Sequence, residues 1–412
     1  MAQRIKTVAV LGSGVMGSGI AAHLAGVGLR VYLLDIVPPE FTEADQKKGL
    51  TQDSKAFRNK FALSNIAAAK KSKPPVFYNP SDAAFITAGN FDDDMDKIAE
   101  CDWIVEAVIE RLDIKQALFA KLDAVRKPGC LITSNTSGLS IEGMCAGRTD
   151  DFRKNFFVTH FFNPVRFMRL LELVPGKETD LDAMNAFAKF GADVLGKGIV
   201  WGKDTPNFIA NRIGTYGLMY TLHAMIEQDF TVGEIDALFG PASGRPKSAV
   251  FRTADLVGLD TLAHVAKNCY DSLTEDECRD TFIMPDFVNA MIDKGMLGSK
   301  TKGGFYKKID GQICVLDYKT MEYKPKEAVR ADSIGAARGI SDVGKKIKAL
   351  VNGDDRFAKL AWESTARTLI YAANRLGEIA DDVFNCDRAM RWGFGWELGP
   401  FETWDAIGLR ES

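Results

Sequence analysis

Short apolar runs that end in glycine or polar residues alternate with helical stretches through the first half of the chain. Thr7–Leu11 (TVAVL) predicts a buried parallel strand, residues 15–27 have the spacing of a helix, and Arg30–Asp35 (RVYLLD) predicts a second strand. Further strands are expected at residues 85–87, 103–107, 131–134, 156–161 and 170–174. This alternation is typical of an α/β fold with a doubly wound sheet of the Rossmann type.

The alternation changes at two places. Residues 38–79 form an insertion longer than a βαβ connection needs, with a helix predicted over 51–71 that ends at the prolines of 73–75. Near residue 203 the strand pattern stops, and Asp204-Thr205-Pro206 predicts the start of a helix. From there the chain reads as mostly helical.

The helical half contains an internal repeat. Residues 251–259 (FRTADLVGL) recur as 401–409 (FETWDAIGL). Upstream, Tyr220, Glu227, Val232 and Asp236 match Tyr371, Glu378, Val383 and Asp387. We interpret these matches as two copies of one helical unit. The expected domains are therefore 1–202, a Rossmann-type domain; 203–310, the first helical copy; 311–355, a connection; and 356–412, a truncated second copy.

The turn after the first strand carries a dinucleotide-binding fingerprint, Gly12-Ser13-Gly14-Val15-Met16-Gly17. Gly12 permits a tight turn, Gly14 lets the backbone approach a pyrophosphate, and Gly17 allows close packing of helix and strand. The helix N-terminus at Val15 and Met16 then faces the phosphates. Asp35 ends the second strand, where it is placed to bind a ribose diol and to repel a 2′-phosphate, so NAD is favoured over NADP.

A histidine with a carboxylate partner is the candidate for proton transfer. His160 ends a predicted strand at the edge where such folds bind ligands, and Glu172 lies at the end of the next strand region. An imidazole held by a carboxylate is suited to remove a hydroxyl proton while a nicotinamide accepts hydride. The alternative is a core histidine within an aromatic run.

Other polar residues have two open interpretations each. Asn135 and Ser137 either orient a substrate oxygen or belong to a helix cap. Asn211 either binds a carbonyl oxygen in a cleft between domains or is a solvated helix residue. Glu110 and Lys115 either contact cofactor ribose or phosphate, or form a surface pair of little energetic value.

Composition narrows the class of protein. The net charge of -3 argues against nucleic-acid or membrane-surface binding, and no apolar run reaches the roughly 18 residues of a membrane span. Seven scattered cysteines show no metal-ligand spacing, so we predict no metal site and a reducing, cytoplasmic location.

The fingerprint, the segment Asn135-Thr136-Ser137, the segment 160–164 (HFFNP), Glu172 and residues 203–212 together resemble the L-3-hydroxyacyl-CoA dehydrogenases of fatty acid β-oxidation. The resemblance implies an NAD-dependent oxidoreductase acting on an acyl-CoA substrate. It implies His160 as the base, Glu172 as its partner, and Ser137 and Asn211 as substrate-orienting residues. It further implies that Asp35, Glu110 and Lys115 contact NAD; Asn135 is grouped with the cofactor-binding residues.

The chain departs from the short members of that family. Asn207 stands where glycine is common, and the 38–79 insertion prevents transfer of the CoA contacts. The duplicated helical unit is similar to that of multifunctional β-oxidation proteins, so we expect a fused or missing enoyl-CoA hydratase region after Ser412. The second copy is expected to replace a second subunit, giving a monomer by an internal pseudo-dimer, with a homodimer as the alternative. Two rival functions remain: a dehydrogenase of a non-CoA hydroxy or sugar acid, and a non-catalytic structural protein with this fold.

Overall fold

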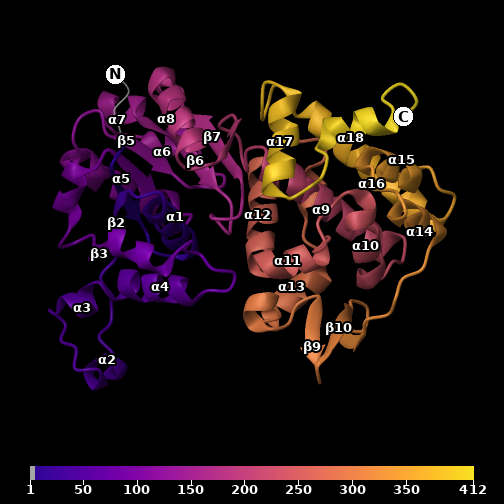
Figure 1. The fold of residues 1–412 in the computed structure, drawn as a ribbon, viewed down its shortest axis with the longest axis horizontal. Helices are drawn as coiled ribbons and strands as arrows, with labels where there is room; N and C mark the ends of the chain where they lie inside the picture. Colours follow the sequence, from indigo (N-terminus) through magenta and orange to yellow (C-terminus); the bar gives the residue numbers. More distant parts are fainter. Residues whose placement is uncertain (1–4) are drawn as a thin grey trace. The chain divides into compact units, whose positions relative to one another are not determined.

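The apolar runs of the first half form one eight-stranded sheet. In the computed structural model (Figure 1), which describes residues 5–412, this sheet has the strand order β3-β2-β1-β4-β5-β6-β7-β8. The strands are β1 (Thr7–Leu11), β2 (Arg30–Asp35), β3 (Ile86–Asn90), β4 (Trp103–Glu106), β5 (Leu131–Ser134), β6 (Phe156–Phe161), β7 (Leu170–Pro175) and β8 (Gly198–Trp201). Every neighbouring pair is parallel except β6–β7. The predicted doubly wound Rossmann-type sheet is confirmed.

Helices connect these strands. The longer ones are α1 (Val15–Gly26), α4 (Lys60–Lys71), α5 (Leu112–Val125) and α8 (Leu181–Asp193). The shorter ones are α2 (Glu43–Lys47), α3 (Lys55–Arg58), η1 (Pro80–Phe85), η2 (Met95–Glu100), α6 (Ile141–Cys145) and α7 (Asp150–Lys154). The helix expected over 51–71 is thus split into α3 and α4, with Ser54 capping the first of them. Strand β8 is not among the expected strands, because its four-residue apolar run carries little periodic signal.

Both faces of the sheet are buried, and apolar side chains on one of them form a core cluster of this first unit. Val8, Val10, Val31, Leu33 and Trp103 are wholly buried and belong to one cluster. A buried side chain of this kind contributes about 1.5–3 kcal/mol. The same burial explains why these strands are readable as continuous apolar runs rather than as alternating ones.

The chain divides into two compact units between Thr205 and Pro206. The second unit begins with α9 (Ala210–Glu227), and not with the helix expected at Asp204-Thr205-Pro206, so that prediction is wrong. Asp204 does not cap α9; its carboxylate accepts the backbone N–H of Ile141 at 3.1 Å instead. Asn207 has a φ of 63°, a left-handed conformation that glycine or asparagine adopts at low cost.

The remaining elements of the second unit are α10 (Val232–Leu238), η3 (Pro241–Ser243), α11 (Phe251–Val257), α12 (Leu259–Ser272), η4 (Arg279–Phe282), α13 (Asp286–Asp293), η5 (Ser299–Thr301), α14 (Asp332–Arg338), α15 (Val343–Val351), α16 (Arg356–Asn374), α17 (Val383–Gly393) and α18 (Pro400–Ile407). A small antiparallel sheet, β11-β10-β9, adds β9 (Tyr306–Ile309), β10 (Gln312–Asp317) and β11 (Glu322–Pro325). The sequence pattern, read as helical, does not anticipate this sheet.

The two copies of the repeat have the same elements in the same order: α9, α10 and α11 correspond to α16, α17 and α18. An aspartate holds the start of the third corresponding helix, α11 or α18, in each copy. Asp236 accepts the backbone N–H of Phe251 at 2.8 Å, and Asp387 accepts that of Phe401 at 2.7 Å. The duplication inferred from the sequence therefore extends to individual hydrogen bonds.

The long helices of the two copies, α9 and α16, pack along each other (Figure 1). Gly217 and Thr368 occupy equivalent positions in the repeat, and a Cβ at Gly217 would lie 3.3 Å from Thr368 Oγ1. Equivalent positions meet each other only near a two-fold axis. The second unit therefore contains a pseudo-two-fold interface between its own halves.

None of the helices in the described part of the chain combines the length and apolar character that crossing a membrane requires. All seven cysteines lie within that part, and none forms a disulfide.

Candidate active site

The candidate site lies at the edge of the sheet where β1, β4, β5 and β6 end. These four strands are parallel neighbours, so their carboxyl ends meet at one edge. The residues that follow them in the chain are the glycine turn, the segment 107–110, the segment 135–137 and Phe162. Ligands of open α/β sheets bind at this edge, next to the point where the strand order reverses.

His160 and Glu172 face each other across two antiparallel strands. They are direct partners in the β6–β7 register, which brings side chains twelve residues apart onto the same face. His160 Nδ1 donates to Glu172 Oε2 at 2.6 Å, and both residues are buried. The carboxylate thereby leaves Nε2 as the nitrogen able to accept a proton.

The second imidazole nitrogen contacts a hydroxyl. His160 Nε2 lies 3.3 Å from Ser137 Oγ, and the ring of Phe162 packs against the imidazole with centroids 4.5 Å apart. The structure therefore brings three of the predicted residues, His160, Glu172 and Ser137, into one hydrogen-bonded line. Such a line can hold a hydroxyl or carbonyl oxygen next to a base.

Glu110 connects this line to the loop after β5. Its Oε1 accepts the backbone N–H of Ser137 at 2.8 Å and the hydroxyl of Thr136. Burial alone raises the pKa of Glu110, but the charge of Lys115 and these two hydrogen bonds outweigh it, so the pKa lies below its usual value. Glu110 is therefore ionised at neutral pH and fixes the position of Ser137.

Lys115 is not part of a surface pair, and that alternative is wrong. The side chain is 1% exposed, and its Nζ lies 2.8 Å from each carboxylate oxygen of Glu106 and 3.2 Å from Glu110 Oε2. Glu106 is wholly buried and also accepts the hydroxyl of Ser134. In this structure Lys115 neutralises the carboxylates of Glu106 and Glu110, next to the candidate site.

The glycine turn has the close contacts that the fingerprint predicts. Gly12 has a φ of 94°, and a Cβ there would lie 2.6 Å from the carbonyl oxygen of Ala107. A Cβ at Gly17 would lie 1.8 Å from the carbonyl oxygen of Gly12. Neither position can carry a side chain without moving backbone atoms, so the turn is held tightly between β1, α1 and the end of β4.

Gly14 is different, because a Cβ there would meet no atom within 4 Å. It is the N-cap residue of α1, and no acidic side chain lies in the first turn with Val15 and Met16. The exposed start of a twelve-residue helix beside open space fits an anionic group such as a pyrophosphate. These residues fit the predicted dinucleotide.

Asp35 reaches back to the same turn. Its Oδ2 accepts the backbone N–H of Ser13 at 2.7 Å and also the Ser13 hydroxyl, which in turn accepts from Asn65 at 2.9 Å. The carboxylate is only partly buried. It is thus oriented beside the glycine turn, as a ribose-binding group must be.

Asn135 and Asn211 are the two further predicted residues. Asn135 Oδ1 accepts the backbone N–H of Phe161 at 2.9 Å, which ties the end of β5 to the end of β6. Asn211 lies in the first turn of α9, in the second unit. Their predicted roles stay predictions.

Glu106 has a part in this geometry and is absent from the sequence-based predictions, whereas Ser13 and Thr136 lie within the motifs that the sequence analysis quotes. The signal for Glu106 is a carboxylate directly after the apolar run of β4, at the ligand-binding edge. A buried carboxylate needs a cation, which points to Lys115 one helical turn into α5.

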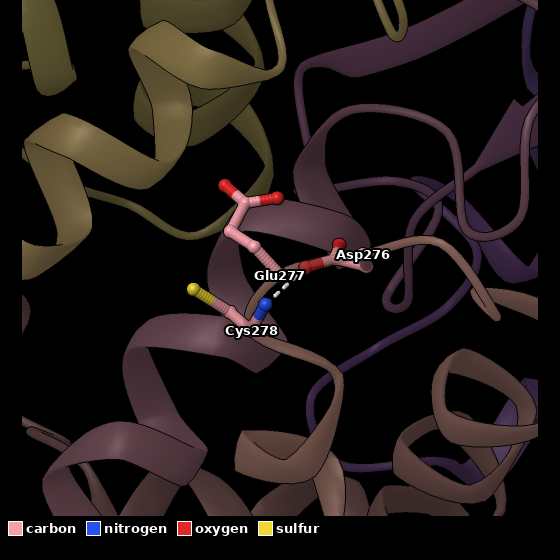
Figure 2. A group of neighbouring side chains, drawn as sticks. All are labelled: Asp276, Glu277 and Cys278. Atoms are coloured by element: carbon pink, nitrogen blue, oxygen red, sulfur yellow. Dashed lines mark hydrogen bonds between the residues drawn. The ribbon is translucent and has the colours of Figure 1, made fainter.

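A possible metal cluster lies elsewhere. Asp276, Glu277 and Cys278 each place a ligand atom within 4.8 Å of the others (Figure 2). However, Asp276 accepts from Arg212 at 2.6 Å and from Arg375 at 3.2 Å, and Glu277 accepts from Arg375 at 2.6 Å. These carboxylates already have cationic partners, so we assign no metal to them.

Comparison with known proteins identifies matching families for both units. The family model described as "3-hydroxyacyl-CoA dehydrogenase, NAD binding domain" matches residues 7–205. The model described as "3-hydroxyacyl-CoA dehydrogenase, C-terminal domain" matches residues 208–308. The first description confirms NAD as the cofactor.

The names of individual similar proteins agree with these two family models. A Bacillus subtilis protein named "Probable 3-hydroxyacyl-CoA dehydrogenase" is 51% identical over 412 residues, covering 100% of this chain and 52% of that protein. A Deinococcus radiodurans protein of the same name is 41% identical over 305 residues, covering 74% of this chain and 83% of that protein. The chain thus spans about half the length of the Bacillus relative.

A solved structure shows the same fold over nearly the whole chain. The Escherichia coli 3-hydroxybutyryl-CoA dehydrogenase has a TM-score of 0.71 at 23% identity, covering 99% of this chain and 93% of that one.

Proposed function

Since the chain belongs to the 3-hydroxyacyl-CoA dehydrogenase family, an NAD-dependent class of oxidoreductases, we propose that it oxidises L-3-hydroxyacyl-CoA to 3-ketoacyl-CoA in fatty acid β-oxidation. The reaction is reversible, and its cofactor is NAD. The observation that carries the proposal is the His160–Glu172 pair, with the second imidazole nitrogen, Nε2, next to the Ser137 hydroxyl.

His160 is the general base in this proposal. Nε2 takes the proton of the 3-hydroxyl group, and Glu172 stabilises the imidazolium that results. General base catalysis of this kind contributes roughly 10²–10⁴ in rate. Ser137 holds the reacting oxygen next to Nε2, and Glu110 keeps Ser137 in place through its backbone N–H.

Bound NAD supplies the hydride acceptor. Gly12, Gly14 and the start of α1 would hold its pyrophosphate, and Asp35 would bind the adenosine ribose. Lys115 contributes through Glu110, which it keeps ionised, rather than by its own contact with the cofactor. Asn211 would donate a hydrogen bond to the substrate carbonyl.

The second helical copy would take the place of a second subunit, and the chain would act as a monomer. The α9–α16 interface within one chain supports this proposal. The greater length of the Bacillus relative supports a further region, an enoyl-CoA hydratase by the resemblance stated above, in the same protein. A cytoplasmic location is likewise proposed.

The substrate is tested by adding NADH with either acetoacetyl-CoA or free acetoacetate and following NADH consumption. We expect consumption with the CoA ester only, and a series of 3-ketoacyl-CoA chain lengths then defines the preference. Equal or faster turnover of free acetoacetate would favour the rival non-CoA dehydrogenase. No turnover of any 3-ketoacyl-CoA would favour the structural protein.

The base is tested separately with His160→Ala. This variant should lose most turnover while its NADH dissociation constant stays near that of the wild type, because His160 contacts Ser137 and Glu172 rather than the glycine turn. Full activity of His160→Ala would overturn the assignment.

A further inference from the structure

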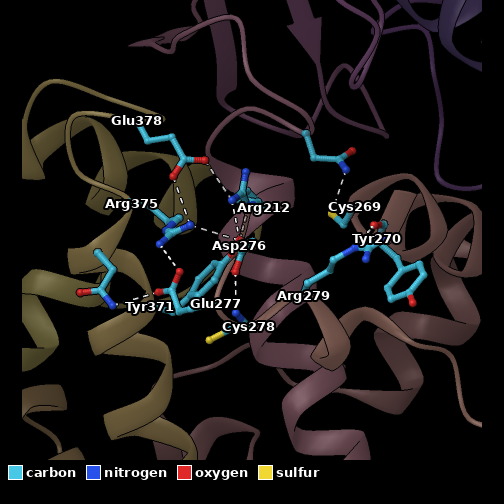
Figure 3. Close-up of polar contacts among 12 residues, drawn as sticks. Arg212, Cys269, Tyr270, Asp276, Glu277, Cys278, Arg279, Tyr371, Arg375 and Glu378 are labelled. Carbon is cyan, nitrogen blue, oxygen red and sulfur yellow. Dashed lines mark hydrogen bonds and ion pairs between the residues drawn. The ribbon is translucent and has the colours of Figure 1, made fainter. Parts of the chain in front are cut away.

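Arg212, the residue after Asn211, is wholly buried, and the second helical copy holds its guanidinium (Figure 3). Its Nε donates to Tyr371 Oη at 2.5 Å, and its Nη2 donates to Glu378 at 3.0 Å. Nη2 also donates to Asp276 at 2.6 Å, in the loop between α12 and η4. Two of these three acceptors lie in the second copy.

Tyr371 is the centre of this network. Its hydroxyl donates to Asp276 Oδ2 at 2.7 Å while it accepts from Arg212, so the three groups form a closed triangle. Its ring stacks on Tyr216 of α9, with centroids 3.8 Å apart and planes 7° apart. The hydroxyl is therefore fixed by both packing and hydrogen bonding.

The beginning of α9 has an uncommon backbone conformation. Asn207 and Phe208, which precede the N-cap residue Ile209, both have positive φ. Asn207 donates to Asn268 and Cys269 of α12. Side-chain contacts of Asn207 and Arg212 thus flank Asn211 in this first helical turn, and those of Arg212 to Tyr371 and Asp276 are buried.

The repeat supplies an equivalent contact at the other side of the pseudo-two-fold interface. The offset of 151 residues that relates Tyr220 to Tyr371 also relates Arg212 to Glu363. Tyr220 Oη donates to Glu363 at 2.6 Å, just as Tyr371 Oη contacts Arg212. One tyrosine contact lies next to Asn211, and its counterpart lies more than two helical turns away along α9.

We propose that Tyr371 and Asp276 are positioning residues, through which the second helical copy orients Asn211 for substrate binding. The inference rests on the proposed role of Asn211 as a substrate-binding residue. It assigns the second copy a part in substrate recognition as well as in the interface.

The test compares Tyr371→Phe with Tyr220→Phe in the full chain. Each variant loses one hydroxyl at equivalent positions of the same interface. We expect Tyr371→Phe to raise the KM for acetoacetyl-CoA about threefold to tenfold, since one buried hydrogen-bonding group is lost, while the KM for NADH is unchanged. Tyr220→Phe should lower Tm by about as much as Tyr371→Phe does, and it should leave both KM values unchanged. Equal kinetic effects of the two variants, or none for Tyr371→Phe, would overturn the proposal.

A double-mutant cycle with Asn211→Ala separates this inference from the proposed function. If Tyr371 acts through Asn211, Tyr371→Phe should have no further effect on KM in the Asn211→Ala background. Additive effects would contradict the inference alone. An Asn211→Ala variant with wild-type kinetics would instead contradict the proposed role of Asn211, and the inference with it.

Discussion

Replacing Glu172 by glutamine removes the charge from the buried His160–Glu172 pair and keeps the shape of the side chain. At the 2.6 Å separation of Nδ1 and Oε2, an imidazolium–carboxylate pair is worth about 6 kcal/mol at an effective dielectric constant of about 20. A hydrogen bond to the amide recovers about 1 kcal/mol of this. Because about 1.4 kcal/mol corresponds to a factor of ten, the Coulomb energy allows a loss in kcat of about 10²–10⁴.

The amide acts on the tautomer as well. A glutamine NH₂ that donates to Nδ1 moves the imidazole proton to Nε2, the nitrogen that faces Ser137. The base is then protonated in its neutral form and cannot accept the substrate proton. Charge and tautomer thus lower kcat in the same direction.

The assay is the saturated rate of NADH consumption with acetoacetyl-CoA. The NADH dissociation constant and Tm of Glu172→Gln check that the fold and the cofactor site are retained. Glu142→Gln is the matched control, because Glu142 is an exposed partner of Lys177 and such pairs are worth little. A kcat of Glu172→Gln within about threefold of the wild type, less than one hydrogen bond is worth, would refute the reasoning.

Three further predictions concern stability, cofactor binding and pH. Lys115→Met leaves Glu106 and Glu110 without their buried cation. The free energy of unfolding, measured with urea, should therefore fall by about 3–5 kcal/mol. A decrease under about 1 kcal/mol, the value of an exposed pair, would contradict the buried pairing. Gly17→Ala places a Cβ 1.8 Å from a carbonyl oxygen, so the glycine turn must move. A titration should then show NADH binding weakened at least about tenfold. An unchanged NADH affinity would contradict the role of this turn in cofactor binding. Burial raises the pKa of Asp387 to about 6, above its value of about 3.9 in an unfolded chain. The folded state therefore holds the proton more tightly, and this group's contribution to stability falls as pH rises from about 4 to about 6. The free energy of unfolding of Asp387→Asn, measured with urea at these two pH values, should lack that fall. The same pH dependence in Asp387→Asn and the wild type would refute this prediction.

Most strands and the ligand-binding edge were predictable because their signals are local. A parallel strand buried on both faces must be apolar throughout, and the glycine turn must have glycine where backbone atoms crowd. The same reasoning failed at Asp204, whose side chain satisfies an N–H of α6 rather than the start of α9. A capping residue in the sequence indicates that its side chain can accept a backbone hydrogen bond, but it does not indicate which helix provides the N–H donor.

The amino-acid sequence by itself determined the fold class, the cofactor fingerprint, the duplication and the identities of His160 and Glu172. Only the tertiary structure decided how these residues pair. The antiparallel register of β6 and β7 places His160 opposite Glu172, and a shift by one residue would turn one of the two side chains to the other face. Likewise, Lys115 has the same sequence neighbours whether it is exposed or buried, and only the tertiary structure, which brings it next to Glu106 and Glu110, makes it the cation that two carboxylates require.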